Sequence, residues 1–256
     1  MAEFALTPKQ QEAQEVLNGP ATHVMLAGGS RSGKTFLIVR KQVQRRLKAP
    51  GSRGAILRFR LGHVRQSIMH DTFPAVMSKC FPDVPYDLNK SELFVKFPGG
   101  GELWFGGLDD KERTEKILGT EFTDIFLNEC SQIPYSSRNM AMTRLAQKVT
   151  DRATGKPLVH KMYYDENPPD KGHWTYRMFK TKCDPESKQL LPNPNDYAFM
   201  QLNPRDNLDN LGADYIKTLE SLPPRLRKRF LEGEFRDSSP NRSEEHTSEL
   251  QSRHNL

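Results

Sequence analysis

The sequence contains little cysteine and no long apolar segment. Three of its 256 residues are cysteine, Cys80, Cys130 and Cys183, and this odd, widely spaced set argues against a disulfide framework and a CxxC-type zinc site. No stretch approaches the roughly 18 to 20 uncharged apolar residues that a membrane helix needs. The first residues also lack the charged start and apolar core of a signal peptide. We therefore expect a soluble protein of a reducing compartment, without membrane contact.

The charges are unequal, with 38 Lys and Arg against 32 Asp and Glu, a formal net charge of +6 and a pI near 9.2. This modest excess favours contact with polyanions without requiring it. Residues 242–252 read RSEEHTSELQS and resemble the translation of a sequencing-library adapter. We expect one folded domain over residues 1–237 and a non-native tail over residues 238–256, which carries no information on the fold.

A glycine-rich segment between a short apolar run and a helical pattern is the strongest motif. Residues 23–27 predict a buried strand, and apolar side chains recur at helical spacing over residues 34–47. The segment between them predicts a phosphate-binding loop of the form GxxxxGKT, made of Gly28, Gly29, Ser30, Arg31, Ser32, Gly33, Lys34 and Thr35. In such a loop backbone N–H groups and the lysine hold phosphates, and the threonine hydroxyl binds Mg²⁺. The alternative is a Gly-rich turn with a chance lysine.

A second short strand ends in two polar residues that suit the other half of a nucleotide site. Residues 124–127 read DIFL and precede Asn128 and Glu129. A carboxylate at such a strand end can touch Mg²⁺ or the attacking water, so we expect Glu129 to orient and polarise that water. Asn128 stands where a Walker B motif usually has aspartate, and its amide oxygen brings no charge to the metal. We assign Thr35, Asn128 and Glu129 to the metal; the alternative for Glu129 is a solvated loop residue.

Two further residues are candidates for contact with ATP. Arg31 is not needed to hold phosphate, and we expect it to sense or stabilise charge developing on the γ phosphate; the alternative is a solvated or ion-paired arginine. Gln10 resembles the glutamine that reads adenine through its side-chain amide in helicase-like ATPases, with Gln11 as the substitute. The spacing Thr7-x-x-Gln10 also fits a helix capping box, which explains Gln10 without any nucleotide.

The order of predicted elements is that of an α/β protein. Strand-length apolar runs alternate with segments of helical periodicity, which implies a mainly parallel sheet with helices on both faces. Two basic groups are candidates for DNA-backbone contact, although such groups are more often solvated faces. The first contains Arg45, Arg46, Lys48, Arg58, Arg60 and Arg65, and the second Arg225, Arg227, Lys228 and Arg229.

Several segments, taken in order, resemble the large subunit of tailed-phage terminases. The run into the second motif reads GGLDD at 106–110, LGTEF at 118–122 and IFLNE at 125–129. The letters NPP at 167–169 with HW at 173–174 resemble the third motif of that family. Segments DN at 206–207 and GEF at 233–235 resemble the end of its ATPase region. Each is weak alone, but their order and spacing together are specific.

The resemblance implies a RecA-like P-loop NTPase of the group with an additional strand between the two nucleotide motifs. It implies an ATP- and Mg²⁺-dependent motor that moves double-stranded DNA into a procapsid, in which Asn167 couples hydrolysis to movement. Implied partners are the phage genome, a portal protein, a small terminase subunit and further copies in a ring, in the host cytoplasm and transiently at the portal. A C-terminal nuclease domain is expected of a complete member and is missing from this sequence.

Two other functions stay open at this point. A superfamily 1 or 2 helicase fragment would share the glutamine motif and the P-loop, but a helicase needs a second RecA-like domain. A nucleotide-binding module without useful turnover would account for Asn128. An arginine of a neighbouring subunit, Arg113 or Arg144, is a candidate to complete the site in trans.

Overall fold

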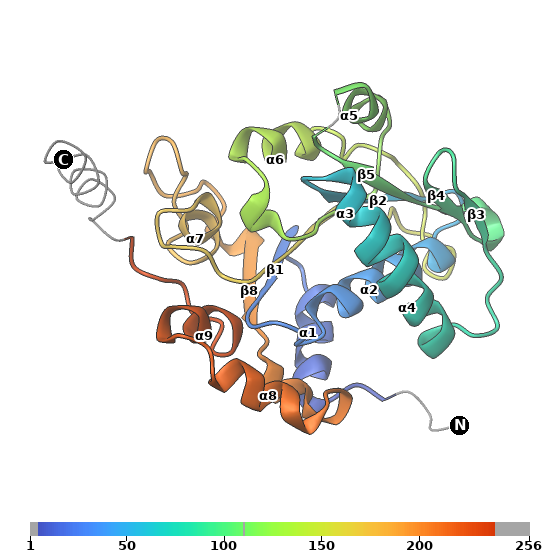
Figure 1. Cartoon of the computed structure of the whole chain (residues 1–256). Coiled ribbons are helices and arrows are strands. Elements are labelled where there is room, and N and C mark those ends of the chain that lie inside the picture. The colour runs from blue at the N-terminus through green and yellow to red at the C-terminus, as the bar shows by residue number, and fades with distance from the viewer. Residues whose placement is uncertain (1–4, 110, 239–256) are drawn as a thin grey trace, which may run out of the picture.

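The computed structural model describes residues 5–109 and 111–238, and the predicted foreign segment at 242–252 lies outside them. The described residues form an eight-stranded sheet in the order β3-β4-β5-β2-β6-β7-β1-β8 (Figure 1). Its strands are β1 (His23–Ala27), β2 (Arg53–Arg58), β3 (Asp87–Asn89), β4 (Phe94–Lys96), β5 (Glu102–Gly107), β6 (Asp124–Leu127), β7 (Lys161–Glu166) and β8 (Tyr197–Gln201).

The sheet is mainly parallel, as the alternation of elements predicts. Strands β5, β2, β6, β7, β1 and β8 run parallel, while β3 and β4 extend one edge in antiparallel fashion. Strand β7 lies between β1, which leads into the glycine-rich loop, and β6, which leads to Asn128 and Glu129. This order confirms a RecA-like fold with an additional strand between the two motifs.

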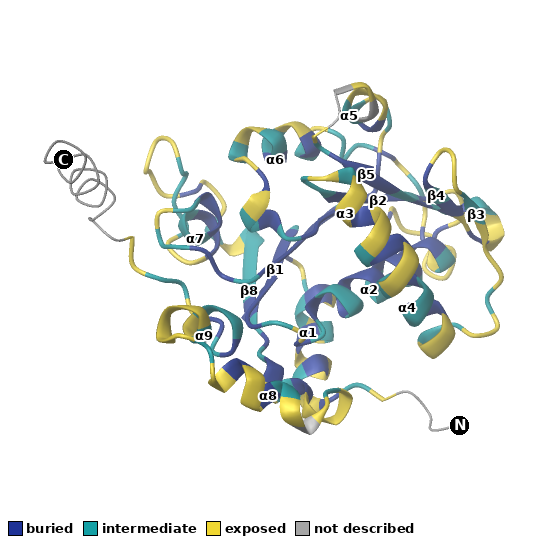
Figure 2. Cartoon of the chain, in the orientation of Figure 1, coloured by how far each residue is buried: buried dark blue, intermediate teal, exposed yellow. Residues whose placement is uncertain are grey.

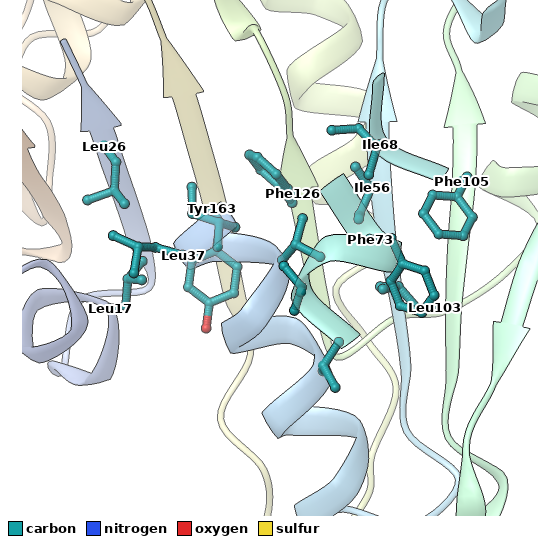
Figure 3. Close-up of a cluster of buried hydrophobic side chains, with 14 of the residues drawn as sticks. Leu17, Leu26, Leu37, Ile56, Ile68, Phe73, Leu103, Phe105, Phe126 and Tyr163 are labelled. Carbon is teal, nitrogen blue, oxygen red and sulfur yellow. The ribbon is translucent and has the colours of Figure 1, made fainter. Parts of the chain in front are cut away.

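Helices cover both faces of the sheet, and each face has its own apolar core. Leu26, Phe126 and Tyr163 point to the face covered by α1, α2 and α4 (Figure 3). Their neighbours Met25, Ile125 and Met162 pack on the other face with α5, α6 and α7. Because successive strand residues point to opposite faces, a strand covered on both sides is buried throughout. The dark central strands in Figure 2 show this burial.

The helices of the structure include the one predicted over residues 34–47, which runs from Lys34 to Lys48. None of those in the described ranges combines the length and apolar character that a bilayer span needs. They are α1 (Pro8–Asn18), α2 (Lys34–Lys48), α3 (Leu61–Val64), α4 (Phe73–Cys80), α5 (Lys111–Leu118), α6 (Tyr135–Met142), α7 (Trp174–Phe179), α8 (Ala213–Glu220) and α9 (Pro224–Phe230), with a π-helix η1 (Arg65–Thr72) between α3 and α4.

The π-helix η1 replaces the middle of what the sequence predicts as one continuous helix over residues 64–79. The Ser67 hydroxyl donates to the His63 carbonyl (2.6 Å), and the Thr72 hydroxyl donates to the Ser67 carbonyl (2.9 Å). Side chains that bond to these carbonyls compete with the regular backbone pattern of an α-helix. Periodicity alone does not reveal such competition, so the wider turns were not predicted.

Buried charges join α2 to the start of β6. Asp124 accepts a hydrogen bond from Arg45 Nε (2.8 Å) and pairs with the Arg46 guanidinium. Gln42 Nε2 (3.0 Å) and the Thr123 hydroxyl (2.7 Å) also donate to its carboxylate. Burial by itself raises the pKa of Asp124, but the two arginines outweigh burial and hold the pKa well below its usual range.

This cluster corrects the first of the two basic groups considered for DNA contact. Arg45 is 3% exposed and Arg46 is fully buried, so neither side chain belongs to a surface that could touch DNA. Their charges were expected to remain outside because they flank the apolar stripe of a predicted helix. The partner that draws them inward, Asp124, lies about 80 residues further along the chain. Arg60 and Arg65 are exposed and stay candidates.

His23, the first residue of β1, is buried among polar aromatic groups. Its ring stacks on Tyr197 at 4.4 Å between centroids, and its Nδ1 lies 2.9 Å from the Tyr164 hydroxyl. Burial and the charge of Arg138, assisted by Lys161 and opposed by Asp196, lower the pKa of His23 to about 3. The folded chain therefore holds this imidazole neutral at ordinary pH.

We predict that His23 makes the folded state less stable as the pH falls below 6.5. In the unfolded chain the imidazole binds a proton near its usual pKa of about 6.5, so the unfolded state binds more protons than the folded state. The stabilisation linked to neutral His23 is complete above pH 6.5 and declines as the pH falls toward 3. By pH 5 the free energy of unfolding has fallen by about 2 kcal/mol. Urea unfolding of wild type and His23→Gln at pH 7 and pH 5 measures it. The exposed His63→Gln control should keep the pH dependence of wild type. If His23→Gln also kept it, the prediction would be refuted.

Candidate functional site

The glycine-rich loop between β1 and α2 depends on backbone geometry that glycine permits. Gly28 and Gly33 have φ angles of 147° and 90°, a region that other residues rarely adopt. A Cβ on Gly28 would lie 1.8 Å from the Leu202 carbonyl oxygen, and one on Gly29 would lie 2.3 Å from the Phe230 carbonyl oxygen. Both glycines therefore allow the loop to approach neighbouring backbone closely.

Residues from the far end of the chain hold this loop in shape. Gly29 N donates to Asn203 Oδ1 (3.0 Å), and Ser30 N donates to the Phe230 carbonyl (2.8 Å). The side chain of Asn207 donates to the Arg31 carbonyl (2.9 Å). Helix α9 and the segment after β8 thus lie against the loop (Figure 1). These hydrogen bonds from distant segments therefore constrain the conformation of the loop.

Lys34, the first residue of α2, is buried at the mouth of the loop. Its ammonium group donates to the carbonyls of Gly28 (3.2 Å) and Gly29 (2.5 Å) and to the Ser32 hydroxyl (3.1 Å). Burial lowers the pKa of Lys34 to about 8, although the negative charge of Asp165 opposes the shift. A desolvated ammonium at the start of a helix is well placed to attract phosphate.

The carboxyl ends of β6 and β7 bring a carboxylate and an amide to the opposite side of the loop. The Thr35 hydroxyl donates to Asp165 Oδ2 (2.5 Å). Asn128 Nδ2 donates to both oxygens of Asp165 (2.9 and 3.1 Å), and Glu129 N donates to Oδ1 (2.7 Å). Burial raises the pKa of Asp165, while its hydrogen bonds and Lys34 oppose the shift. Asp165 is thus the polar centre that joins the loop to both strands.

Glu129 follows β6 in a left-handed conformation with φ of 48°. Its carboxylate pairs with Arg58 Nη2 (2.8 Å) at the end of β2 and accepts a bond from Gln132 Nε2 (3.3 Å). The side chain is 38% exposed, whereas that of Arg58 is 12% exposed. The glutamate therefore reaches solvent at the mouth of the site, and a cation of the neighbouring parallel strand holds it.

These groups line one open pocket of about 280 Å³, close to the lower end of the range of small-molecule sites. It brings together most of the side chains predicted from the sequence. Of the predicted site residues, those that do not line it are Gln10, Gly28, Gly29, Ser32 and Gly33. The lining residues are Ser30, Arg31, Lys34, Thr35, Arg58, Ser67, Ile68, Asp71, Thr72, Asn128, Glu129, Asp165, Glu166 and Asn167.

Gln10 forms the capping box that was the alternative to adenine recognition. Thr7 N donates to Gln10 Oε1 (3.1 Å), and Gln10 N donates to the Thr7 hydroxyl (3.3 Å). The remaining amide nitrogen donates to Asn207 Oδ1 (3.0 Å), the same side chain that holds the Arg31 carbonyl. Both ends of the buried Gln10 amide thus have partners within the chain, and one of them supports the glycine-rich loop.

Arg113 and Arg144 were predicted as candidates to complete the site of a neighbouring subunit. The side chain of Arg113 lies outside the described residues, and Arg144 follows α6, where its Nε donates to the Thr143 hydroxyl (3.1 Å). Of the second basic group, Arg225 and Lys228 are exposed on α9. These assignments stay predictions.

The sequence did not single out Asp165, Asn203 or Arg58 for this site. Asp165 had a detectable signal, because it directly follows the residues MYY at 162–164 and stands two residues before the Asn167 motif. Polar residues at the carboxyl ends of parallel strands meet at one edge of the sheet. Asn203 and Arg58 had no comparable signal, since their roles depend on contacts with distant segments.

Comparisons with known proteins agree with this architecture. Residues 21–230 match the family model described as phage terminase large subunit, whereas a search of curated proteins finds no match. The large terminase of a thermophilic bacteriophage is similar with a TM-score of 0.72 and 16% identity, over 91% of this chain and 54% of that chain. The large terminase ATPase domain of Thermus phage P74-26 is similar with a TM-score of 0.62 and 17% identity, over 91% of this chain and 94% of that chain.

A third similar structure is the HK97 bacteriophage large terminase, with a TM-score of 0.53 and 10% identity over 97% of this chain and 48% of that chain. This chain spans about half the length of the whole large terminases and nearly all of the ATPase domain. At these identities the solved structures establish the fold, and the family model covers more than half of the sequence. The chain therefore belongs to the phage terminase large subunit family.

Proposed function

We propose that this chain is the ATPase motor of a terminase large subunit, which couples ATP hydrolysis to movement of double-stranded DNA into a procapsid. One observation carries the proposal: Lys34 and Thr35 of the glycine-rich loop share a pocket with Asn128, Glu129 and the strand-end residue Asp165. A helix N-terminus with a lysine binds phosphate, and a strand-end carboxylate can position the attacking water. The large terminase of the thermophilic bacteriophage was also solved with ADP and with ATP-γ-S.

In this proposal, the site residues predicted from the sequence have distinct roles. The loop amides and Lys34 hold the β and γ phosphates, and Glu129 orients and polarises the water that attacks the γ phosphorus. Arg31, exposed in the loop, stabilises charge on the γ phosphate. Mg²⁺ would neutralise phosphate charge; the Thr35 hydroxyl is a hard oxygen ligand of the kind it prefers, and the Asn128 amide oxygen can accept a hydrogen bond from a water bound to it.

Movement of DNA requires a link between the pocket and the rest of the chain. Asn167 lines the pocket directly after β7, and we propose that it transmits hydrolysis to movement. DNA, a portal protein, a small terminase subunit and further copies in a ring are the proposed partners, in the host cytoplasm and at the portal. They derive from the family, of whose whole members this chain spans about half.

Steady-state ATP hydrolysis with and without duplex DNA tests this function. We expect hydrolysis that duplex DNA stimulates, without separation of the strands. Strand separation would favour a helicase, and nucleotide binding without turnover would favour an inert module. Either result contradicts the proposed motor.

Gln10→Ala separates adenine recognition from support of the loop. Because both ends of the Gln10 amide bond within the chain, we expect the affinities for ATP and GTP to fall by the same factor, about 5- to 10-fold for the lost hydrogen bond to Asn207, which supports the loop. Isothermal titration of both nucleotides measures this effect, with exposed Gln189→Ala as the control. A loss confined to ATP would show instead that Gln10 reads adenine.

A further inference from the structure

The P-loop threonine does not bond to the residue at the Walker B aspartate position. The partner of the Thr35 hydroxyl is Asp165, at 2.5 Å, on the neighbouring strand β7. Leu127 at the end of β6 is in register with Tyr164 of β7, so Asn128 and Asp165 are the next residues along adjacent parallel strands. The carboxylate that faces the threonine therefore lies on β7, one strand away from the Walker B position at the end of β6.

Asn128 is arranged to hold this carboxylate rather than to replace it. Its amide nitrogen donates to both oxygens of Asp165 (2.9 and 3.1 Å). Its amide oxygen is buried and has no hydrogen-bond partner among the described residues, in a side chain that is only 2% exposed. A buried polar oxygen without a partner is costly. The unpaired Asn128 oxygen thus indicates a ligand in the pocket that donates hydrogen bonds, such as metal-bound water.

We propose that Asp165 supplies the negative charge of the Mg²⁺ site in place of a Walker B aspartate, with Asn128 as a neutral oxygen acceptor beside it. This inference rests on the proposed nucleotide site. Within the described residues, no group of three His, Cys, Asp or Glu side chains could hold a metal alone. Nucleotide phosphates must therefore complete the site, which is the usual arrangement for Mg²⁺ with one or two carboxylates.

The two side chains form a complementary pair, so their exchange is informative. Asp165→Asn removes the charge and leaves two amides side by side. Asn128→Asp alone would place two carboxylates within about 3 Å, where like charges cannot both ionise readily. The double exchange, Asn128→Asp with Asp165→Asn, keeps one carboxylate and one amide and moves the charge to the usual Walker B position.

The test is binding of Mn²⁺ to the protein saturated with ADP, followed by electron paramagnetic resonance. We expect Asp165→Asn to weaken Mn²⁺ about 10- to 100-fold and the double exchange to restore most of that affinity. Asp87→Asn, which removes an exposed carboxylate at the start of β3, outside the pocket, is the matched control and should leave Mn²⁺ affinity unchanged. Binding of ADP without metal should be similar in all variants.

Two results would overturn different statements. If Asp165→Asn binds Mn²⁺ as tightly as wild type while ADP still binds, the assignment of Asp165 is wrong and the nucleotide site stands. If wild type binds no ADP with or without metal, the proposed function fails as well. If Asp165→Asn does not fold, the double exchange provides the test. Wild-type Mn²⁺ affinity in the double exchange supports the assignment of Asp165, and loss of that affinity in a folded protein contradicts the assignment.

Discussion

Glu129→Gln should lower kcat for ATP hydrolysis by about 10²- to 10⁴-fold, which is the range expected for loss of a general base. Glutamine keeps the size of the side chain and its contact with Gln132, but it cannot polarise the attacking water as a carboxylate does. In the proposed site the loop and Lys34 hold the phosphates, so affinity for ATP should change little. Steady-state hydrolysis and isothermal titration measure the two quantities separately.

A matched control is available at the other end of the same strand. Glu121 is exposed just before β6, so Glu121→Gln makes the same chemical change away from the pocket and should retain wild-type kcat. A Glu129→Gln protein with wild-type turnover would show that another residue activates the water. Loss of ATP affinity equal to the loss of kcat would assign Glu129 to binding rather than to chemistry.

Asp124→Asn should destabilise the folded chain by about 3 to 5 kcal/mol, because removal of one partner leaves uncompensated buried charge. Arg45 and Arg46 both pair with this carboxylate, and their side chains are 4% and 0% exposed. The substitution preserves side-chain volume, so a cavity does not contribute. Urea unfolding at pH 7 gives the free energy of unfolding.

Asp87→Asn is the control for this change, since Asp87 also begins a strand but is exposed. Its effect should stay within about 0.5 kcal/mol, as for most surface substitutions. A loss below about 1 kcal/mol for Asp124→Asn would contradict the account of a tightly coupled cluster. It would mean that solvent or rearrangement satisfies the two arginines after the carboxylate is lost.

Local patterns in the sequence predicted much of the fold. Residues 23–27 and 124–127 form strands with the expected bounds, and the complete P-loop pattern lies between a strand and a helix as its chemistry requires. These predictions succeeded because short apolar runs and glycine positions depend on neighbouring residues. The short strand β3 was missed, since the three residues 87–89 are too few to show alternation.

Contacts between distant segments could not be predicted in the same way. Asn207 supports the loop from 176 residues away, and the inward course of Arg46 depends on Asp124, 78 residues away. The proposed role of Asp165 also depends on the position of β7 between β1 and β6. A strand order is a property of the assembled sheet, so Thr35, Asn128 and Glu129 were assigned to the metal from the sequence without Asp165.

ATP hydrolysis by Lys34→Ala, compared with wild type, tests the central claim most directly. Lys48→Ala, at the opposite end of α2 in a side chain that is 44% exposed, is the control for loss of a lysine from the same helix. The account predicts that Lys34→Ala loses about 10²-fold or more of the hydrolysis rate, through loss of charge that stabilises the transferring phosphoryl group, while Lys48→Ala keeps it. Equal hydrolysis by Lys34→Ala and wild type would contradict the assignment of the glycine-rich loop as the ATP site.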